Sequence, residues 1–262
     1  MDVQKSQIYF TRTYRRLRSG GWQGVLFVCL LVIPSEIVLF WGLPELTRWM
    51  SWLAVKLLCA RFRGLQIQIT TSEFPIAGSV SFVDLPTVYP NLSTIIGNLL
   101  VATVILVFIC TGRRQGKPVA VFTAIMMVTH YVNCVFFLFA KNFFPYTAFH
   151  YSNLYVTQQA SVWIFFILLA GGTIGFMGRR GALYKILAFL AIIFYSMAFG
   201  VVRYVFFLYI LERFSIFYMA LLFFVFGPFF DFVYLVWIYA LYISRMGRLY
   251  DSAEERGEWT WS

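Results

Sequence analysis

The chain has 262 residues, of which 61% are hydrophobic, 21% aromatic and only 12% charged. Soluble domains carry roughly 25% charged residues, so this chain has too little polar surface to face water on all sides. Its mean hydropathy of +0.77 agrees. The composition excludes a soluble enzyme and a disordered chain, and it predicts an integral membrane protein. We attribute the net charge of +10 to orientation signals and contacts with anionic headgroups, rather than to nucleic-acid binding.

The N-terminal third predicts one transmembrane helix followed by an interfacial helix. Residues 1–21 are basic and are expected to form a cytoplasmic segment. An apolar run over 22–43, interrupted by Pro34 and Glu36, predicts the first transmembrane helix. Residues 44–63 place Trp, Leu and Val on one helical face and basic residues elsewhere, which is typical of an amphipathic helix lying in the outer membrane interface.

A β signal follows this helix. Polar and apolar residues alternate strictly over 65–70 and again over 79–83, with a break at 74–78 between the two runs. This alternation has the period of a half-buried strand, and the break contains Pro and Gly. We therefore expect a small β-hairpin, and we place the whole segment 44–92 outside the cytoplasm.

Five further apolar runs predict transmembrane helices, because each has the roughly 20 residues that a hydrocarbon core requires. They cover residues 93–111, 118–140, 158–178, 183–211 and 214–244. Six spans put both chain ends on one side. That side carries fourteen Lys and Arg residues against six on the other, so the positive-inside rule predicts cytoplasmic ends, as in a bacterial inner-membrane protein.

The predicted fold is therefore an all-α integral membrane protein. We expect a six-transmembrane helix bundle in one membrane domain over 22–247, with the small extracytoplasmic β-hairpin and the interfacial amphipathic helix as its outer part. Residues 248–262 are expected to form an acidic cytoplasmic tail.

Four ionisable residues inside the predicted spans are candidate functional residues, because charges at this depth are costly and rare. They are Glu36, His130, Arg203 and Asp231. Counted at about 1.5 Å per residue, three of them lie at similar depth and Arg203 lies further out. Its long side chain still allows a pair with Asp231 or Glu36. Two interpretations stay open: a polar cluster that moves protons or binds an ion or headgroup, and a structural ion pair.

Aromatic and basic residues outside the spans are candidate contacts to a partner or to headgroups. Residues 141–157 contain six aromatic residues and His150 between two predicted spans, so we treat them as an outer loop. An interfacial aromatic belt and stacking on a sugar or a partner protein both use such residues. The candidate contacts are Arg61, Arg63, Phe143, Phe144, Tyr146, His150 and Tyr151.

Motifs for the common chemistries are missing from the sequence. The two His residues are twenty positions apart, and no P-loop, GxSxG motif or CxxC pair occurs. We therefore expect no metal, no cofactor and no catalytic residue. A transferase acting on a lipid-linked substrate would need a carboxylate at the outer face, and its candidates are Glu73, Asp84 and Glu212.

The layout of residues 170–245 resembles the C-terminal half of exosortases, which are membrane transpeptidases. A basic turn, a long span with an embedded Arg in FGVVRYVFFLYI, a short break and an aromatic-rich last span occur in the same order. The resemblance carries over only Arg203. Where that family has its Cys, this chain reads LLAGGTIG, and no His follows Arg203. The resemblance therefore implies that peptidase activity has been lost.

The first hundred residues look like membrane proteins that accompany exosortase or exopolysaccharide systems. We expect a non-catalytic polytopic subunit of a cell-envelope complex for export, sorting or polysaccharide, which docks a partner with its outer segment. The partners would be other membrane-protein subunits and anionic lipid headgroups. The alternatives are a small proton- or ion-linked transporter that uses the four intramembrane charges, and the membrane transferase.

Overall fold

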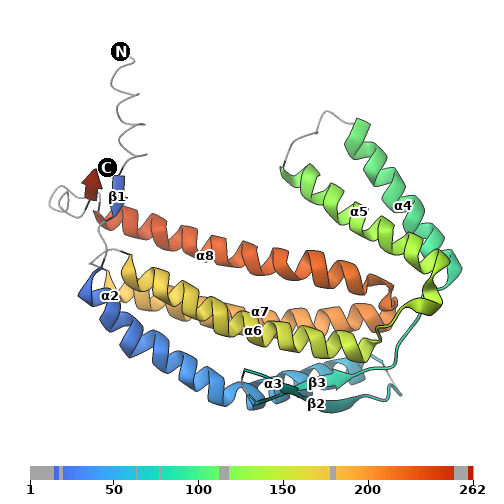
Figure 1. Ribbon diagram of the computed structural model, residues 1–262, viewed down its shortest axis with the longest axis horizontal. Coiled ribbons are helices and arrows are strands. Elements are labelled where there is room, and N and C mark those ends of the chain that lie inside the picture. Colours follow the sequence, from blue (N-terminus) through green and yellow to red (C-terminus); the bar gives the residue numbers. More distant parts are fainter. Residues whose placement is uncertain are drawn as a thin grey trace. The chain divides into compact units, whose positions relative to one another are not determined.

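The computed structural model describes residues 15–17, 20–62, 64–76, 78–111, 118–177, 181–250 and 259–261. Within these residues lie six helices that are long and apolar enough to cross a membrane, as the sequence predicted (Figure 1). Their bounds are Trp22–Arg61, Leu92–Thr111, Pro118–Phe139, Ala148–Phe176, Ala182–Arg213 and Ile216–Arg245. Residues 112–117 and 178–180, and most of the two terminal segments, lie outside the described residues.

The chain divides into two compact units. The first comprises residues 1–42, 161–198 and 233–262, and the second comprises residues 43–160 and 199–232. In the first unit, β1 (Arg15–Leu17) pairs antiparallel with β4 (Trp259–Trp261). The sequence did not predict this sheet, because strands of three residues are too short to show an alternating pattern.

Close helix packing marks the first unit. It contains α2 (Trp22–Phe27), the π-helical segment η1 (Val28–Val32) and parts of α6 (Ala148–Phe176) and α7 (Ala182–Arg213). A Cβ added to Gly171 on α6 would lie 2.7 Å from both Val32 and Phe189. A small residue at this point allows the helices to approach closely, as is common between membrane helices.

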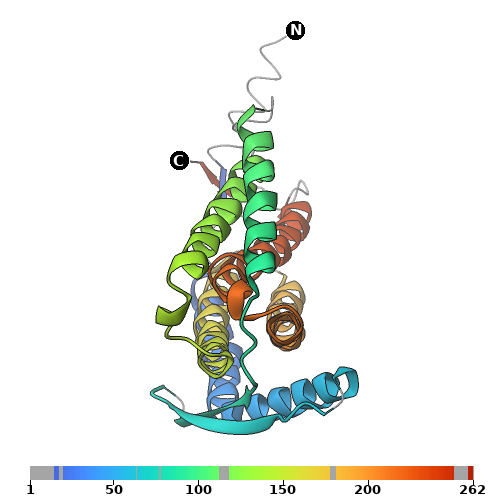
Figure 2. The same ribbon diagram turned by 90° about the vertical axis from the view of Figure 1, so that its right-hand side faces the viewer.

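The second unit contains the hairpin and the remaining helices. Its elements are the later part of α3 (Ile33–Arg61), β2 (Gln68–Phe74), β3 (Gly78–Asp84), α4 (Leu92–Thr111), α5 (Pro118–Phe139), η2 (Lys141–Phe143), the start of α6, the end of α7, η3 (Ile216–Tyr218), η4 (Leu221–Phe226) and the start of α8 (Gly227–Tyr250). Helices α4 and α5 lie side by side, which both views show (Figures 1 and 2).

The predicted hairpin is present, with different bounds. Strand β2 runs from Gln68 to Phe74 instead of over 65–70, and it pairs antiparallel with β3 from Gln68↔Asp84 to Phe74↔Gly78. Gly78 closes the turn with φ of 84°, a conformation that glycine adopts without steric cost. The alternating pattern ends at Thr70, because Thr71 and Ser72 are both polar. It therefore left the second half of β2 out of the predicted strand.

Helix α3 packs on this hairpin with one regular face. Its buried residues recur at helical spacing: Leu43, Thr47, Met50, Ser51, Ala54 and Leu58. Two of them bond the backbone of β3, since Ser81 N–H donates to Thr47 Oγ1 (3.1 Å) and Ser51 donates to the Ser81 carbonyl (2.9 Å). Figures 1 and 2 both show the hairpin beside α3. The opposite face exposes Trp49, Trp52 and Lys56.

The first helix and the predicted interfacial helix are continuous. The apolar segment Trp22–Arg61 has 40 residues, or about 60 Å of helix, against a hydrocarbon core of roughly 30 Å. One straight crossing would leave about half of this length outside the core. The amphipathic half after Leu43 is the part suited to the interface, because its exposed Trp and Lys side chains are those found at headgroup level.

Two prolines follow π-helical segments. Segment η1 ends at Val32, two residues before Pro34, and η4 ends at Phe226, two residues before Pro228. Proline lacks the N–H that would donate to the carbonyl four residues earlier, and its ring collides with that carbonyl. The widened π turn relieves both problems. The helix continues through Pro34, which interrupts the apolar run in the sequence.

The fourth helix begins at Ala148 rather than at residue 158. The predicted outer loop over 141–157 is therefore too long, because its last ten residues are helical. Hydrogen bonds between Thr147 and His150 explain why the helix begins at Ala148. The His150 N–H faces Thr147 Oγ1 (3.4 Å) and the Thr147 N–H donates to His150 Nδ1 (3.3 Å), a reciprocal arrangement similar to a capping box.

The close approach at Gly171 predicts a local steric effect. We expect Gly171→Ala to lower the stability of the detergent-solubilised protein by about 1–3 kcal/mol, because the new methyl group overlaps Val32 and Phe189. Gly172→Ala is the matched control, since its Cβ has no neighbour within 4 Å. Thermal unfolding followed by circular dichroism measures both variants. Equal melting temperatures for the two would show that the helices separate easily.

Candidate functional site

The site is built around a buried ion pair between Arg203 on α7 and Asp231 on α8. Each residue is only 5% exposed. The guanidinium Nη1 lies 3.1 Å from Asp231 Oδ1, and Nη2 donates to Asp231 Oδ2 at 3.1 Å. The pair is therefore bidentate, the strongest geometry that Arg and a carboxylate form. This pairing is one of the two that the sequence allowed.

Three further acceptors complete the surroundings of Arg203. Its Nε donates to the Tyr155 hydroxyl and its Nη1 to the Gly227 carbonyl, both at 2.8 Å. Its Nη2 also donates to Gln159 Oε1. An arginine has five N–H donors; four hydrogen bonds from Arg203 are formed within the protein, and Nη1 also lies 3.1 Å from Asp231 Oδ1. Each of the three guanidinium nitrogens therefore has an acceptor among the described residues.

Sequence reasoning missed Tyr155 and Gln159. Tyr155 was placed in the outer loop, yet it lies on α6 with Tyr151 one turn before it and Gln159 one turn after. All three side chains are buried. The helical spacing of these residues was a signal that could have found them. The Gln159 Nε2 and the Tyr151 hydroxyl have no hydrogen-bond partner among the described residues.

Stacked tyrosines connect the ion pair to the hairpin. The rings of Tyr155 and Tyr204 stack with centroids 5.2 Å apart. The Tyr204 hydroxyl accepts from the Val83 N–H on β3 (2.8 Å) and bonds Ser152 (2.7 Å). A buried set of contacts thus runs from Arg203 through two tyrosines to the backbone of the hairpin.

His130 belongs to a separate polar cluster in the same unit. Asn98 donates to the Thr94 carbonyl (2.8 Å), which fixes the orientation of its amide, and its Oδ1 accepts from Tyr218 (3.1 Å). His130 Nε2 lies 3.1 Å from the same Oδ1 and must therefore carry the proton. The other ring nitrogen, Nδ1, is buried and has no partner among the described residues.

Glu36 lies in the first unit, near the start of α3. Its side chain is half-buried, and Oε1 has no hydrogen-bond partner in the described part of the chain. Arg203 and Asp231 form the ion pair, His130 joins Asn98 and Tyr218, and Glu36 belongs to the other unit.

The predicted contact residues differ in their accessibility. Phe143, Tyr146 and His150 are exposed, and Phe144 is half-buried. Tyr151, by contrast, is fully buried and packs on Tyr155 and Phe223, so its ring is not available at the surface. Arg61 is exposed at the end of α3, with its guanidinium 5.9 Å from the Phe62 ring centroid. Arg63 lies outside the described residues.

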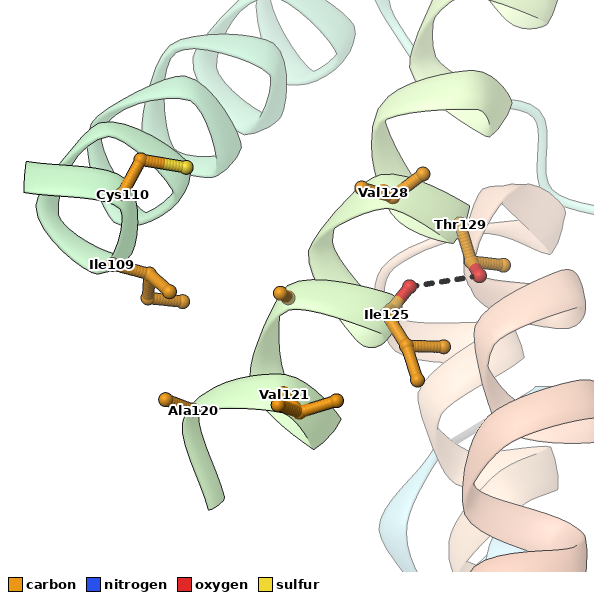
Figure 3. A pocket seen from close by; sticks show the side chains of 8 residues that line it. Ile109, Cys110, Ala120, Val121, Ile125, Val128 and Thr129 are labelled. Carbon is orange, nitrogen blue, oxygen red and sulfur yellow. Dashed lines mark hydrogen bonds between the residues drawn. The ribbon is translucent and has the colours of Figure 1, made fainter. Parts of the chain in front are cut away.

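Helices α4 and α5 enclose an apolar groove of about 480 Å³ (Figure 3). Its lining includes Ile109 and Cys110 on α4 and Val121 and Ile125 on α5. The hydroxyl of Thr129 donates back to the Ile125 carbonyl (3.0 Å), which Figure 3 shows as a dashed line. Apart from Cys110 and Thr129 the lining is apolar, so the groove offers shape to an apolar chain.

The three carboxylates expected at the outer face lie on different elements: Glu73 on β2, Asp84 at the end of β3 and Glu212 near the end of α7. No group of three or more His, Cys, Asp or Glu residues that would suit a metal ion occurs among the described residues. No protein-family model, curated protein or solved structure matches this chain. The site is therefore interpreted from its own geometry.

Removing one partner of the buried pair should lower the free energy of unfolding much more than removing one partner of an exposed pair. We expect Asp231→Asn to lower the free energy of unfolding by about 3–5 kcal/mol, because it leaves Arg203 buried without a counter-ion. The exposed Glu45–Arg48 pair, at 2.9 Å, is the matched control, and Glu45→Gln should cost at most about 0.5 kcal/mol. Denaturant titration in mixed micelles measures both. Similar losses in the two variants would contradict a structural role for the buried pair.

Proposed function

We propose that the chain is a non-catalytic, polytopic subunit of a membrane-protein complex, which binds a partner chain at its extracytoplasmic face. The complex would act in the cell envelope, in export, sorting or polysaccharide handling, as the layout resemblance to exosortases implies. In this proposal both chain ends are cytoplasmic and the membrane is a bacterial inner membrane, following the distribution of Lys and Arg in the sequence.

One observation carries the proposal: the contacts of the buried Arg203 lead through two tyrosines to the hairpin, and not to a cavity that could hold a substrate. Arg203 bonds Tyr155, Tyr155 stacks on Tyr204, and Tyr204 accepts from Val83 on β3. Each nitrogen of the guanidinium has an acceptor among the described residues. A network of this kind supports a structural role, because a substrate-binding Arg keeps donors free for its ligand.

The hairpin is held more firmly than a connecting loop requires. Strand β3 has four consecutive buried residues, from Val80 to Val83. Its backbone is bonded by Thr47, Ser51 and Tyr204 from two helices. A rigid outward element without catalytic groups is suited to recognition, since a preorganised surface loses little entropy on binding.

The proposal is tested by isolating the tagged chain from its native membranes in mild detergent. We expect a complex with a second membrane protein at fixed stoichiometry, measured by native mass spectrometry. Tyr204→Phe should weaken the complex, because it leaves the Val83 N–H unbonded and loosens β3. Tyr131→Phe, an exposed tyrosine on α5, is the control and should leave the complex intact. A well-behaved monomer without a co-purifying chain would contradict the proposal.

A proton-linked transporter is the second candidate, and His130 favours it. Its Nε2 lies 3.1 Å from Asn98 Oδ1, and its Nδ1 is buried and without a partner among the described residues. A group in that state can accept a proton within the membrane. The oxygen Glu36 Oε1 is similarly unpartnered, although it lies in the first unit.

This candidate predicts a measurable proton flux. In liposomes with an imposed pH gradient and a trapped pH-sensitive dye, His130→Gln should reduce the flux to the level of empty liposomes, because Gln cannot take up a proton. His150→Gln is the control, since His150 is an exposed helix cap. Flux that is absent from the unmodified chain, or unchanged in His130→Gln, would eliminate the transporter.

A further inference from the structure

The two edges of the hairpin differ in whether their outward backbone groups are hydrogen-bonded. Those of β3 are bonded to helix side chains, and within the described part of the chain those of β2 are not. Strand β3 turns the N–H groups of Ser81 and Val83 away from β2, because they donate to Thr47 and Tyr204. Hydrogen-bonded and non-hydrogen-bonded pairs alternate along an antiparallel ladder. The pairs Ile69↔Val83 and Thr71↔Ser81 are therefore of the second kind.

It follows that β2 also turns the backbone groups of alternate residues outward. Ile69, Thr71 and Glu73 direct their N–H and C=O groups away from β3, by the same alternation. Among the described residues these groups have no hydrogen-bond partner. The side chains of all three are exposed. Strand β2 is thus an open edge, the kind that adds a further strand from another chain.

We propose that the open edge of β2 binds an extended segment of a partner polypeptide, which adds a third strand to the hairpin. This inference rests on the proposed function and names the mode of binding. The main-chain groups of Ile69, Thr71 and Glu73 supply up to six hydrogen bonds, a donor and an acceptor from each residue. Strand β3, held by the helices, fixes the position of β2.

The charge of the edge indicates the chemistry of the partner. Glu73 is exposed near the end of β2, and it has no ion-pair partner within the described part of the chain. Opposite charges on directly opposed residues stabilise paired strands, and like charges destabilise them. The added segment should therefore carry Lys or Arg opposite Glu73, with β-branched residues on either side.

A second copy of this chain fits the edge less well. Antiparallel pairing of two β2 strands centred on Thr71 places each Glu73 opposite Ile69 of the other copy. Pairing centred on Glu73 places two carboxylates opposite each other, which is unfavourable. Neither register gives the carboxylate a basic neighbour. The partner is therefore a different polypeptide.

The test uses the full chain in lipid nanodiscs and two synthetic probes. One probe is a seven-residue peptide of alternating Thr and Val with a single Lys, and its twin carries Glu in place of Lys. We expect the Lys peptide to slow amide hydrogen exchange at Ile69, Thr71 and Glu73 at least about tenfold. Residues between them are already bonded to β3 and should change little. The Lys peptide should bind about fivefold more tightly than its twin.

Three variants separate strand addition from other binding. Glu73→Lys changes an exposed side chain and should reverse the preference between the two peptides. Thr71→Pro removes an outward N–H without removing a ladder bond, so it should abolish binding of both peptides. Thr71→Val keeps the N–H and should bind like the unmodified chain.

The outcomes distinguish this inference from the proposed function. Equal binding of the two peptides, exchange that slows uniformly along β2, or unchanged binding by Thr71→Pro would overturn strand addition. Protection of Ile69, Thr71 and Glu73 without any peptide, together with a dimeric mass, would show that a second copy occupies the edge and would also overturn it. If the complex from native membranes persists in Thr71→Pro, the chain is a subunit whose partner binds elsewhere.

Discussion

The second unit depends on the bidentate pair between Arg203 and Asp231. A charge removed from water is tolerated only when it is paired and its remaining hydrogen-bonding groups are satisfied. Here the guanidinium meets both conditions, because Tyr155, Gln159 and the Gly227 carbonyl accept the donors that the carboxylate leaves. The arrangement fixes three helices relative to one another at one point: α6, α7 and α8. The tyrosines beside it then hold β3 of the hairpin.

The two strands of the hairpin are consequently different in kind. Strand β3 is buried on both faces and bonded by helix side chains, so it belongs to the core of its unit. Strand β2 carries polar and charged side chains and exposes most of them. Its Ser72 hydroxyl bonds Asn153 on α6 (2.8 Å), which adds a tie to the helices on one face. A two-stranded hairpin alone is marginally stable in water, and the helices supply the missing support.

Composition and periodicity were sufficient for the larger elements. Apolar runs gave the six helices, and alternation gave the hairpin, because both patterns are written in local sequence. The first ten residues of α6 were missed, since Asn153, Thr157 and several tyrosines lower the hydropathy of a segment that is nevertheless helical. The pairing of Arg203 with Asp231 was only one of two possibilities. Depth along a helix can be counted, whereas rotation about its axis and the choice of neighbours depend on packing. The spacing of Tyr155 and Gln159 places them on one helix face, but it does not name Arg203 as their partner.

The π-helical segment Leu221–Phe226 changes which residues of the last helix share a face. Each widened turn accommodates one residue more than an α turn, so the wheel of residues before Leu221–Phe226 is offset from the wheel after it by about 100°. A single helical wheel drawn through Ile216–Arg245 therefore mixes two phases and blurs the boundary between lipid-facing and inward-facing positions. Deleting one residue within that segment would bring both halves back into phase. Asp231 would then point to a different side of the helix from the one on which Arg203 lies.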